Sequence, residues 1–179
     1  MENYAVPSQK LKMIFETHRL YVRQWQNTDL QNLHQLYSDK AIMEYIRPIL
    51  TLEETKKIFD NQMAEYSANQ YIGRYLIIEK RSNSFVGIFL LRKPENRDGV
   101  EIGYAFRLQD WGKGFATEIV KEGIQYVFTT TDFSSIYAFT DMKNVNSKNV
   151  LLKSGFTFLE NIIEDGEKLN VFTLNKRLN

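Results

Sequence analysis

The segment VEIGYAFRLQDWGKGFATE, residues 100–118, joins an apolar stretch to an amphipathic one through a turn that contains two glycines. Residues 100–108 predict a strand, and residues 114–129 place apolar side chains at helical spacing. Gly112 and Gly114 allow backbone N–H groups to approach a ligand closely at the positive end of this helix. The turn therefore predicts either a phosphate cradle made of backbone amides or only a reversal of the chain.

Two common nucleotide-binding motifs do not fit this turn. A P-loop requires glycine at position 107, which is Arg107, and Ser or Thr at position 114, which is Gly114. A Rossmann fingerprint requires a third small residue at position 117, which is Thr117, and it opens a fold instead of following its fourth strand. The only remaining indication of nucleotide or phosphate binding is therefore the backbone geometry that the two glycines allow at the start of the helix.

The rest of the chain predicts a single mixed α/β domain with helices on both faces of one sheet. We expect a strand at 16–25, helices at 27–39 and 51–70, strands at 71–79, 85–91 and 100–108, a helix at 114–129, a strand at 134–140, a helix at 146–154, and strands at 155–161 and 168–176. Thr51 and Glu54 form a capping box at the clearest helix start. Residues 1–13 are expected to be a flexible extension, and the domain is expected to span 14–179.

Composition excludes several classes of function. The 179 residues carry a formal net charge of +1, so nothing indicates a general attraction to nucleic acid or to an anionic membrane. The chain has no cysteine, which removes disulfides, thiolate nucleophiles and zinc–thiolate sites. Its two histidines, His18 and His34, have no second ligand at metal spacing, so no metal is expected. There is no apolar run of about 20 residues and no signal peptide, and we expect a cytoplasmic protein.

A second motif, NVNSKNVLLKSGF, covers residues 144–156. Asn144 and Ser147 stand three apart at a helix start, where they either satisfy free N–H groups or point past the helix end into a cleft. The two interpretations are compatible. Glu101 is the other candidate for chemistry, because an acid inside an apolar strand must face water or pair with another group. It is either a base with a raised pKa in a cleft or an exposed strand position.

Together, the two motifs resemble the GNAT superfamily of acyl-CoA-dependent N-acetyltransferases. More narrowly, they resemble the branch of the ribosomal-protein-alanine acetyltransferases of the RimJ/RimL type. The opening FETHRLYVRQW, residues 15–25, also resembles the usual start of that branch, so the similarity extends from Ile14 to the end. The chain differs from the superfamily pattern at Trp111, where Gln or Arg is usual, and at Leu108, where Pro is frequent.

The resemblance implies a GNAT-type domain whose mostly antiparallel sheet of about seven strands is splayed between strands 100–108 and 134–140. It implies acetyl-CoA as the cofactor and assigns its binding by position. Tyr104, Ala105 and Phe106 would offer backbone groups to the pantetheine arm, and Asn144 would contact the same arm. The pyrophosphate would lie on the segment formed by Trp111, Gly112, Lys113, Gly114, Phe115, Ala116 and Thr117, mainly on its amides, with Lys113 in a secondary role.

The implied activity is direct transfer of an acetyl group to a primary amine in a ternary complex, without a covalent enzyme intermediate. Glu101 would accept the amine proton and Ser147 would protonate the thiolate, whereas the tyrosine acid of other branches has no clear counterpart. Glu44, Tyr45 and Arg47, within MEYIRPIL, are expected to bind the acceptor, which is a protein N-terminal amine or a small amine. A non-catalytic acyl-CoA sensor and an interaction module remain alternatives, and the resemblance is compatible with a homodimer.

Overall fold

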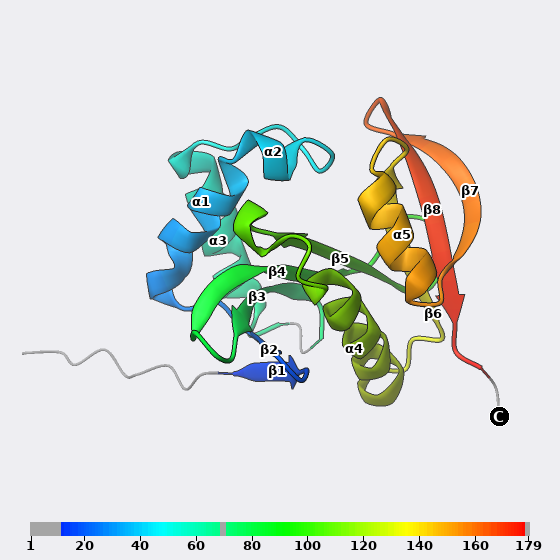
Figure 1. Ribbon diagram of the computed structural model, residues 1–179, viewed down its shortest axis with the longest axis horizontal. Coiled ribbons are helices and arrows are strands. Elements are labelled where there is room, and N and C mark those ends of the chain that lie inside the picture. The colour runs from blue at the N-terminus through cyan, green and yellow to red at the C-terminus, as the bar shows by residue number, and fades with distance from the viewer. Residues whose placement is uncertain (1–11, 69–70, 178–179) are drawn as a thin grey trace, which may run out of the picture.

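The computed structural model describes residues 12–68 and 71–177. Figure 1 shows one open sheet with helices packed on both of its faces. The strands are β1 (Met13–Glu16), β2 (Leu20–Arg23), β3 (Gly73–Glu79), β4 (Ser84–Arg92), β5 (Val100–Phe106), β6 (Ser135–Asp141), β7 (Thr157–Glu164) and β8 (Glu167–Asn175). The helices are α1 (Leu30–Tyr37), α2 (Lys40–Met43), α3 (Leu52–Glu65), α4 (Phe115–Thr130) and α5 (Val145–Lys153), with short 3-10 helices at Asn27–Asp29 and Leu108–Asp110.

The predicted mixed α/β class with helices on both faces is confirmed, but the sheet has eight strands in the order β1-β2-β3-β4-β5-β6-β8-β7. The additional strand comes from the N-terminal stretch, which was expected to form one strand over 16–25. The chain instead reverses at Thr17, whose amide donates to the carbonyl of Leu20 at 2.8 Å and whose hydroxyl accepts from the Leu20 amide at 2.9 Å. This turn separates β1 from β2. β1 begins at Met13, one residue before the boundary at Ile14 that was expected from the sequence.

The sheet separates two hydrophobic cores. One face packs against α4 and α5 through side chains such as Phe89, Ile102 and Ile119. The other face packs against α1 to α3 through side chains such as Trp25 and Phe59, whose rings stack 5.7 Å apart. Burial of a large apolar side chain contributes about 1.5 to 3 kcal/mol, so these two cores fix the order of the layers.

The predicted capping box at the start of α3 is confirmed. The Glu54 amide donates to Oγ1 of Thr51 at 3.2 Å, and the Thr51 amide donates to Oε2 of Glu54 at 2.8 Å. Two otherwise unpaired N–H groups at the helix terminus are thereby satisfied.

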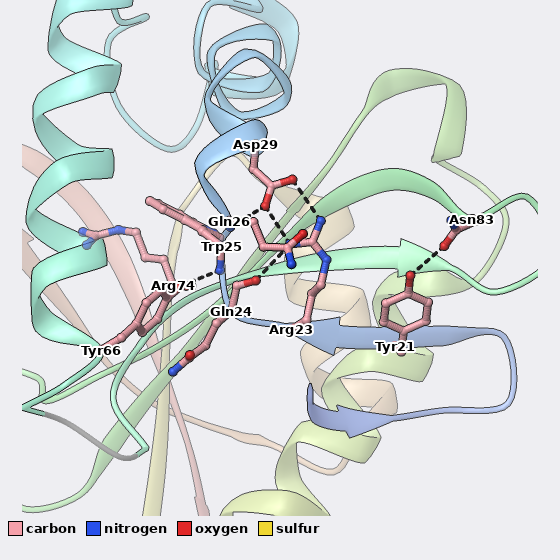
Figure 2. Close-up of polar contacts among 9 residues, drawn as sticks. All are labelled: Tyr21, Arg23, Gln24, Trp25, Gln26, Asp29, Tyr66, Arg74 and Asn83. Carbon is pink, nitrogen blue, oxygen red and sulfur yellow. Dashed lines mark hydrogen bonds and ion pairs between the residues drawn. The ribbon is translucent and has the colours of Figure 1, made fainter. Parts of the chain in front are cut away.

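A buried ion pair fixes the path from β2 into α1. Figure 2 shows the guanidinium of Arg23 against the carboxylate of Asp29, with distances of 2.6 and 2.9 Å. The same carboxylate accepts a hydrogen bond from the Gln26 amide at 2.6 Å. Both charged side chains are less than one tenth exposed, which is tolerated only because each is paired and hydrogen-bonded. Figure 2 also shows that the Tyr66 hydroxyl accepts a hydrogen bond from the Trp25 amide and donates one to the carbonyl of Arg74.

No helix within residues 12–68 and 71–177 is long and apolar enough to cross a membrane.

Candidate active site

The two central strands β5 and β6 are the only parallel pair in the described sheet, and they pair over a short distance. Val100 lies opposite Ile136, and Glu101 lies opposite Tyr137, but no later residue of β5 has a partner on β6. On its other side β5 stays paired with β4 as far as Phe106. The sheet therefore opens into a slot, defined here as the space between β5 and β6 beyond Glu101, at the position expected from the sequence.

Strand alternation determines which backbone groups of β5 face this slot. The amide of Arg107 donates to the carbonyl of Val86 on β4 at 2.9 Å. Since alternate residues of a strand direct their N–H and C=O groups to opposite sides, Ala105 also faces β4, whereas Tyr104 and Phe106 face the slot. The backbone groups of Ala105, which is paired with Ile88, are therefore directed to β4 and not to the slot. The Phe106 carbonyl is also engaged, because it accepts from the indole N–H of Trp111 at 2.8 Å.

The glycine turn leads from the end of β5 into α4. Gly112 and Gly114 have φ angles of +74° and +80°, in the left-handed region that side chains disfavour. A Cβ at Gly112 would meet nothing within 4 Å, so the turn requires glycine for its backbone conformation and not for space. Gly114 is the N-cap residue of α4 and no side chain caps this helix. The first amides of α4, beginning with Phe115, therefore have no side-chain cap, and free amides at a helix N-terminus favour negatively charged groups.

Side chains around the turn hold it in place. The Lys113 ammonium lies 2.7 Å from Oδ1 of Asp110, a buried carboxylate that also accepts from Nε of Arg107 at 2.8 Å. On the other side, Arg19 donates through Nη1 to the carbonyl of Lys113 at 2.9 Å and through Nε to Glu118 at 2.7 Å. Lys113 therefore supports the loop through its contact with Asp110. Ala116 and Thr117, in the first turn of α4, are half-buried.

The first turn of α5 brings the hydroxyl of Ser147 close to a side chain of β5. Asn144 caps α5, because its Oδ1 accepts from the amide of Ser147 at 3.0 Å, so the capping interpretation is confirmed. The hydroxyl of Ser147 lies 3.4 Å from that of Tyr104. Burial, opposed by the hydrogen bond with Ser147, raises the pKa of Tyr104 to about 12. The phenol is therefore protonated at neutral pH. This hydroxyl was missed, because sequence reasoning assigned Tyr104 only a backbone role.

Glu101 lies on the opposite face of β5. It is only 6% exposed, and Oε2 accepts from Nε of Arg92 at 2.6 Å across the strand pair. Because Glu101 is buried, it does not occupy an exposed strand position, which was one of the two alternatives. Arg92 provides the partner that a buried acid needs. Burial raises the pKa of Glu101 above its usual value, although the hydrogen bond and charge of Arg92 oppose this effect. No local sequence signal identified Arg92 as the partner of Glu101, because the register of β4 and β5 decides which residues face each other.

A cavity of about 200 Å³ adjoins Glu101 at the narrow end of the slot. Its lining residues come from β4, the β4–β5 loop, β5, β6 and the β7–β8 hairpin, and include Arg92, Glu95, Glu101, Phe139, Glu164 and Asp165. The region 43–50 contributes no lining residue to this cavity. Glu44 is exposed and raises the pKa of the neighbouring Tyr45 by its charge, whereas Arg47 is half-buried over the ring of Tyr37. In Figure 1 the segment around α2 lies on one side of the open end of the sheet and the β7–β8 hairpin on the other.

No group of three or more His, Asp or Glu side chains that would suit a metal ion occurs in the part of the chain that the structure describes.

The fold and this site define a class of protein. The chain matches the acetyltransferase (GNAT) domain over residues 19–157 and belongs to this family.

Several known proteins are similar to this one over most of its length. An uncharacterized N-acetyltransferase, p20 of Bacillus licheniformis, is 29% identical over 155 residues, which are 85% of this chain and 86% of that protein. The ribosomal L7/L12 N-acetyltransferase RimL in complex with coenzyme A is structurally similar, with a TM-score of 0.77 and 19% identity over 92% of this chain and 98% of the other. A spermidine N-acetyltransferase from Vibrio cholerae with CoA and spermine gives a TM-score of 0.75 and 17% identity over 88% and 95%.

Proposed function

We propose that this protein transfers an acetyl group from acetyl-CoA to a primary amine, by direct attack in a ternary complex. The observation that carries the proposal is the slot between β5 and β6, which ends at a glycine turn whose helix has no side-chain cap. Family membership supports an acetyltransferase, and two structurally similar acetyltransferases have been solved with coenzyme A. Both lines of support favour acetyl-CoA as the donor of the acetyl group.

The residues present fit acetyl-CoA. The amides from Gly112 to Thr117 would bind the pyrophosphate, because left-handed glycines and an uncapped helix N-terminus present N–H groups to an anion. The N–H and C=O of Tyr104, together with the N–H of Phe106, face the slot and would pair with the pantetheine arm in the manner of an added strand. Asn144 would contact the same arm through its amide nitrogen, since its oxygen is used for capping.

Acetyl-CoA supplies an acyl group that is activated as a thioester. The protein holds the amine next to this group and moves two protons. Glu101, directly or through water, would accept a proton from the amine, and its raised pKa brings it closer to neutral pH. The hydroxyl of Tyr104 or that of Ser147 would deliver a proton to the sulfur, since the two oxygens lie 3.4 Å apart. A slot-facing N–H of β5 would donate to the carbonyl oxygen that gains negative charge.

The acceptor would enter from the face of the sheet that carries Glu101. Alternation along β5 places Glu101 on the α1–α3 face and Tyr104 on the α4–α5 face, so the proton acceptor and the proton donor lie on opposite sides of the slot. Glu44, Tyr45 and Arg47 would contribute from the segment after α2. The resemblance to the RimJ/RimL branch favours an α-amine at the end of a peptide, and a small amine fits the cavity equally well.

Two measurements test this function. Thermal unfolding with and without acetyl-CoA tests binding, because a ligand at 100 times its Kd stabilises the folded state by about 2.7 kcal/mol. Release of free thiol with a panel of amines and N-terminal peptides tests transfer. Binding without thiol release on any amine would favour the acyl-CoA sensor, and absence of binding would exclude both the enzyme and the sensor.

A further inference from the structure

Two arginines near the candidate acceptor site have no counter-ion within the described part of the chain. Salt bridges to carboxylates engage Arg19, Arg23, Arg92, Arg97 and Arg107. Arg47 and Arg74 are half-buried, yet neither side chain makes a hydrogen bond or ion pair with another residue in 12–68 or 71–177. In Figure 2 the guanidinium of Arg74 points away from the Arg23–Asp29 pair and has no dashed contact. A partly desolvated cation without a partner is a binding element for an anion.

These arginines lie close together on the α1–α3 face of the sheet. Arg74 of β3 is opposite Leu90 of β4, so Arg92, two residues further along β4, is its diagonal neighbour on the same face. Diagonal neighbours in antiparallel strands are about 7 to 8 Å apart. Arg47 lies over the ring of Tyr37, with its Cζ 5.9 Å from the ring centre. Burial and, after it, the positive charges of Arg74 and Arg92 lower the pKa of Arg47 below its usual value.

The adjoining cavity has the opposite character. Four carboxylates and two basic side chains line it, and the negative charge of Glu164 contributes to the raised pKa of Glu101. Acidic groups next to the slot would hold an ammonium group before its proton is removed. The site therefore has an acidic part at Glu101 and Glu164 and a basic part at Arg47 and Arg74.

We propose that the acceptor is a small zwitterion, an amino acid or a close analogue, whose amine enters the acidic cavity and whose carboxylate is bound by Arg47 and Arg74. This inference rests on the proposed function and names its substrate class. The planar guanidinium matches a carboxylate with two parallel hydrogen bonds, a geometry that a lysine does not reproduce. A polyamine has no anionic group and would bring further positive charge toward three arginines.

The test compares matched pairs of amines that differ only in the carboxylate. Suitable pairs are phenylalanine with phenethylamine, leucine with isoamylamine, and lysine with cadaverine, with spermidine added as a polyamine. We expect kcat/KM to be at least about 10-fold higher for the amino acid in the pair whose side chain fits, since hydrogen bonds to charged groups are the stronger class. Equal rates within every pair, or a preference for spermidine, would overturn the zwitterion proposal and leave the acetyltransferase function intact.

Two variants connect this preference to the arginines. Arg74→Gln and Arg47→Gln should each reduce the amino acid to amine ratio toward one. Arg81→Gln is the matched control, because Arg81 is an exposed cation in the β3–β4 turn, at the opposite end of these strands from Arg74 and Arg92. This control should keep the full ratio, and a ratio that falls equally in all three variants would point to net charge instead of a site.

Calorimetric titration keeps the inference testable without turnover. With coenzyme A present at saturation, the amino acid should bind at least about 10-fold more tightly than its decarboxylated partner, and Arg74→Gln should remove the difference. If acetyl-CoA binds and no amine is acetylated, the proposed function fails, while selective binding of a carboxylate would still support the basic subsite. If no carboxylate binds selectively, the subsite itself is refuted.

Discussion

The hydroxyl of Tyr104 on β5 lies 3.4 Å from that of Ser147 in the first turn of α5, and the two residues are 43 positions apart in the chain. This contact places two proton donors on one side of the slot. Ser147 was expected from the resemblance, whereas Tyr104 supplies a phenol where no tyrosine acid was expected. Both hydroxyls are protonated at neutral pH, and burial raises the pKa of Tyr104 to about 12. A phenol is nevertheless a stronger acid than an aliphatic alcohol, so we expect Tyr104 to be the better of the two donors to a departing thiolate.

Tyr104→Phe should lower kcat by about 100-fold, the lower end of the usual contribution of a general acid, with acetyl-CoA affinity nearly unchanged. Ser147→Ala should have a smaller effect, because Ser147 would then act mainly by orienting the phenol. Steady-state rates at saturating acetyl-CoA provide kcat, and thermal shifts provide affinity. A normal kcat in Tyr104→Phe together with a large loss in Ser147→Ala would return the donor role to Ser147.

Gly114→Val should abolish the stabilisation by acetyl-CoA, whereas Lys113→Ala should weaken binding less than about 10-fold. A branched residue disfavours the φ of +80° at Gly114, so the amides of the turn would move. Lys113 instead contacts Asp110, and its loss leaves the amides in place. Calorimetric titration with coenzyme A measures both affinities, and far-UV circular dichroism checks that each variant folds. The reverse order of effects would refute the amide cradle.

Glu118→Gln should reduce the free energy of unfolding at pH 7 by about 1.5 to 3 kcal/mol, the range for hydrogen bonds to a charged group. Burial raises the pKa of Glu118, but hydrogen bonds from Thr17 and Arg19 outweigh burial and hold it below its usual value near 4.5. A depressed folded-state pKa stabilises the protein above the unfolded pKa, and this contribution is lost as the pH falls through the folded pKa. The difference between the variant and the natural protein should therefore begin to shrink as the pH falls below the unfolded pKa of about 4.3, and it should vanish only below the folded-state pKa.

Urea denaturation across the pH range measures this difference. Glu122→Gln serves as the control, since Glu122 lies one turn further along α4 and makes no hydrogen bond with another described residue. A constant difference between Glu118→Gln and the natural protein at all pH values would show that packing, and not charge, explains the effect.

Local signals in the sequence predicted most of the elements correctly. The capping box at Thr51 and Glu54 and the glycine turn after β5 depend on residues close together in the chain. Both features could therefore be predicted from the sequence. The reversal at Thr17 was missed, because the alternation of Leu20 and Val22 continues beyond it and hides the turn. Residues 1–11 of the expected flexible extension lie outside the described residues.

The sequence by itself determined the family pattern, the position of the glycine turn and the presence of an acid in the strand before it. Only the tertiary structure decided that Glu101 is buried against Arg92, that Ala105 faces β4, and that Tyr104 meets Ser147. The physical reason is that register and strand alternation set these contacts, and both arise from pairing between segments that are distant in the chain. Among the described residues Arg74 has no carboxylate partner, and this is likewise a property of the folded sheet, which brings Arg74 next to Arg92.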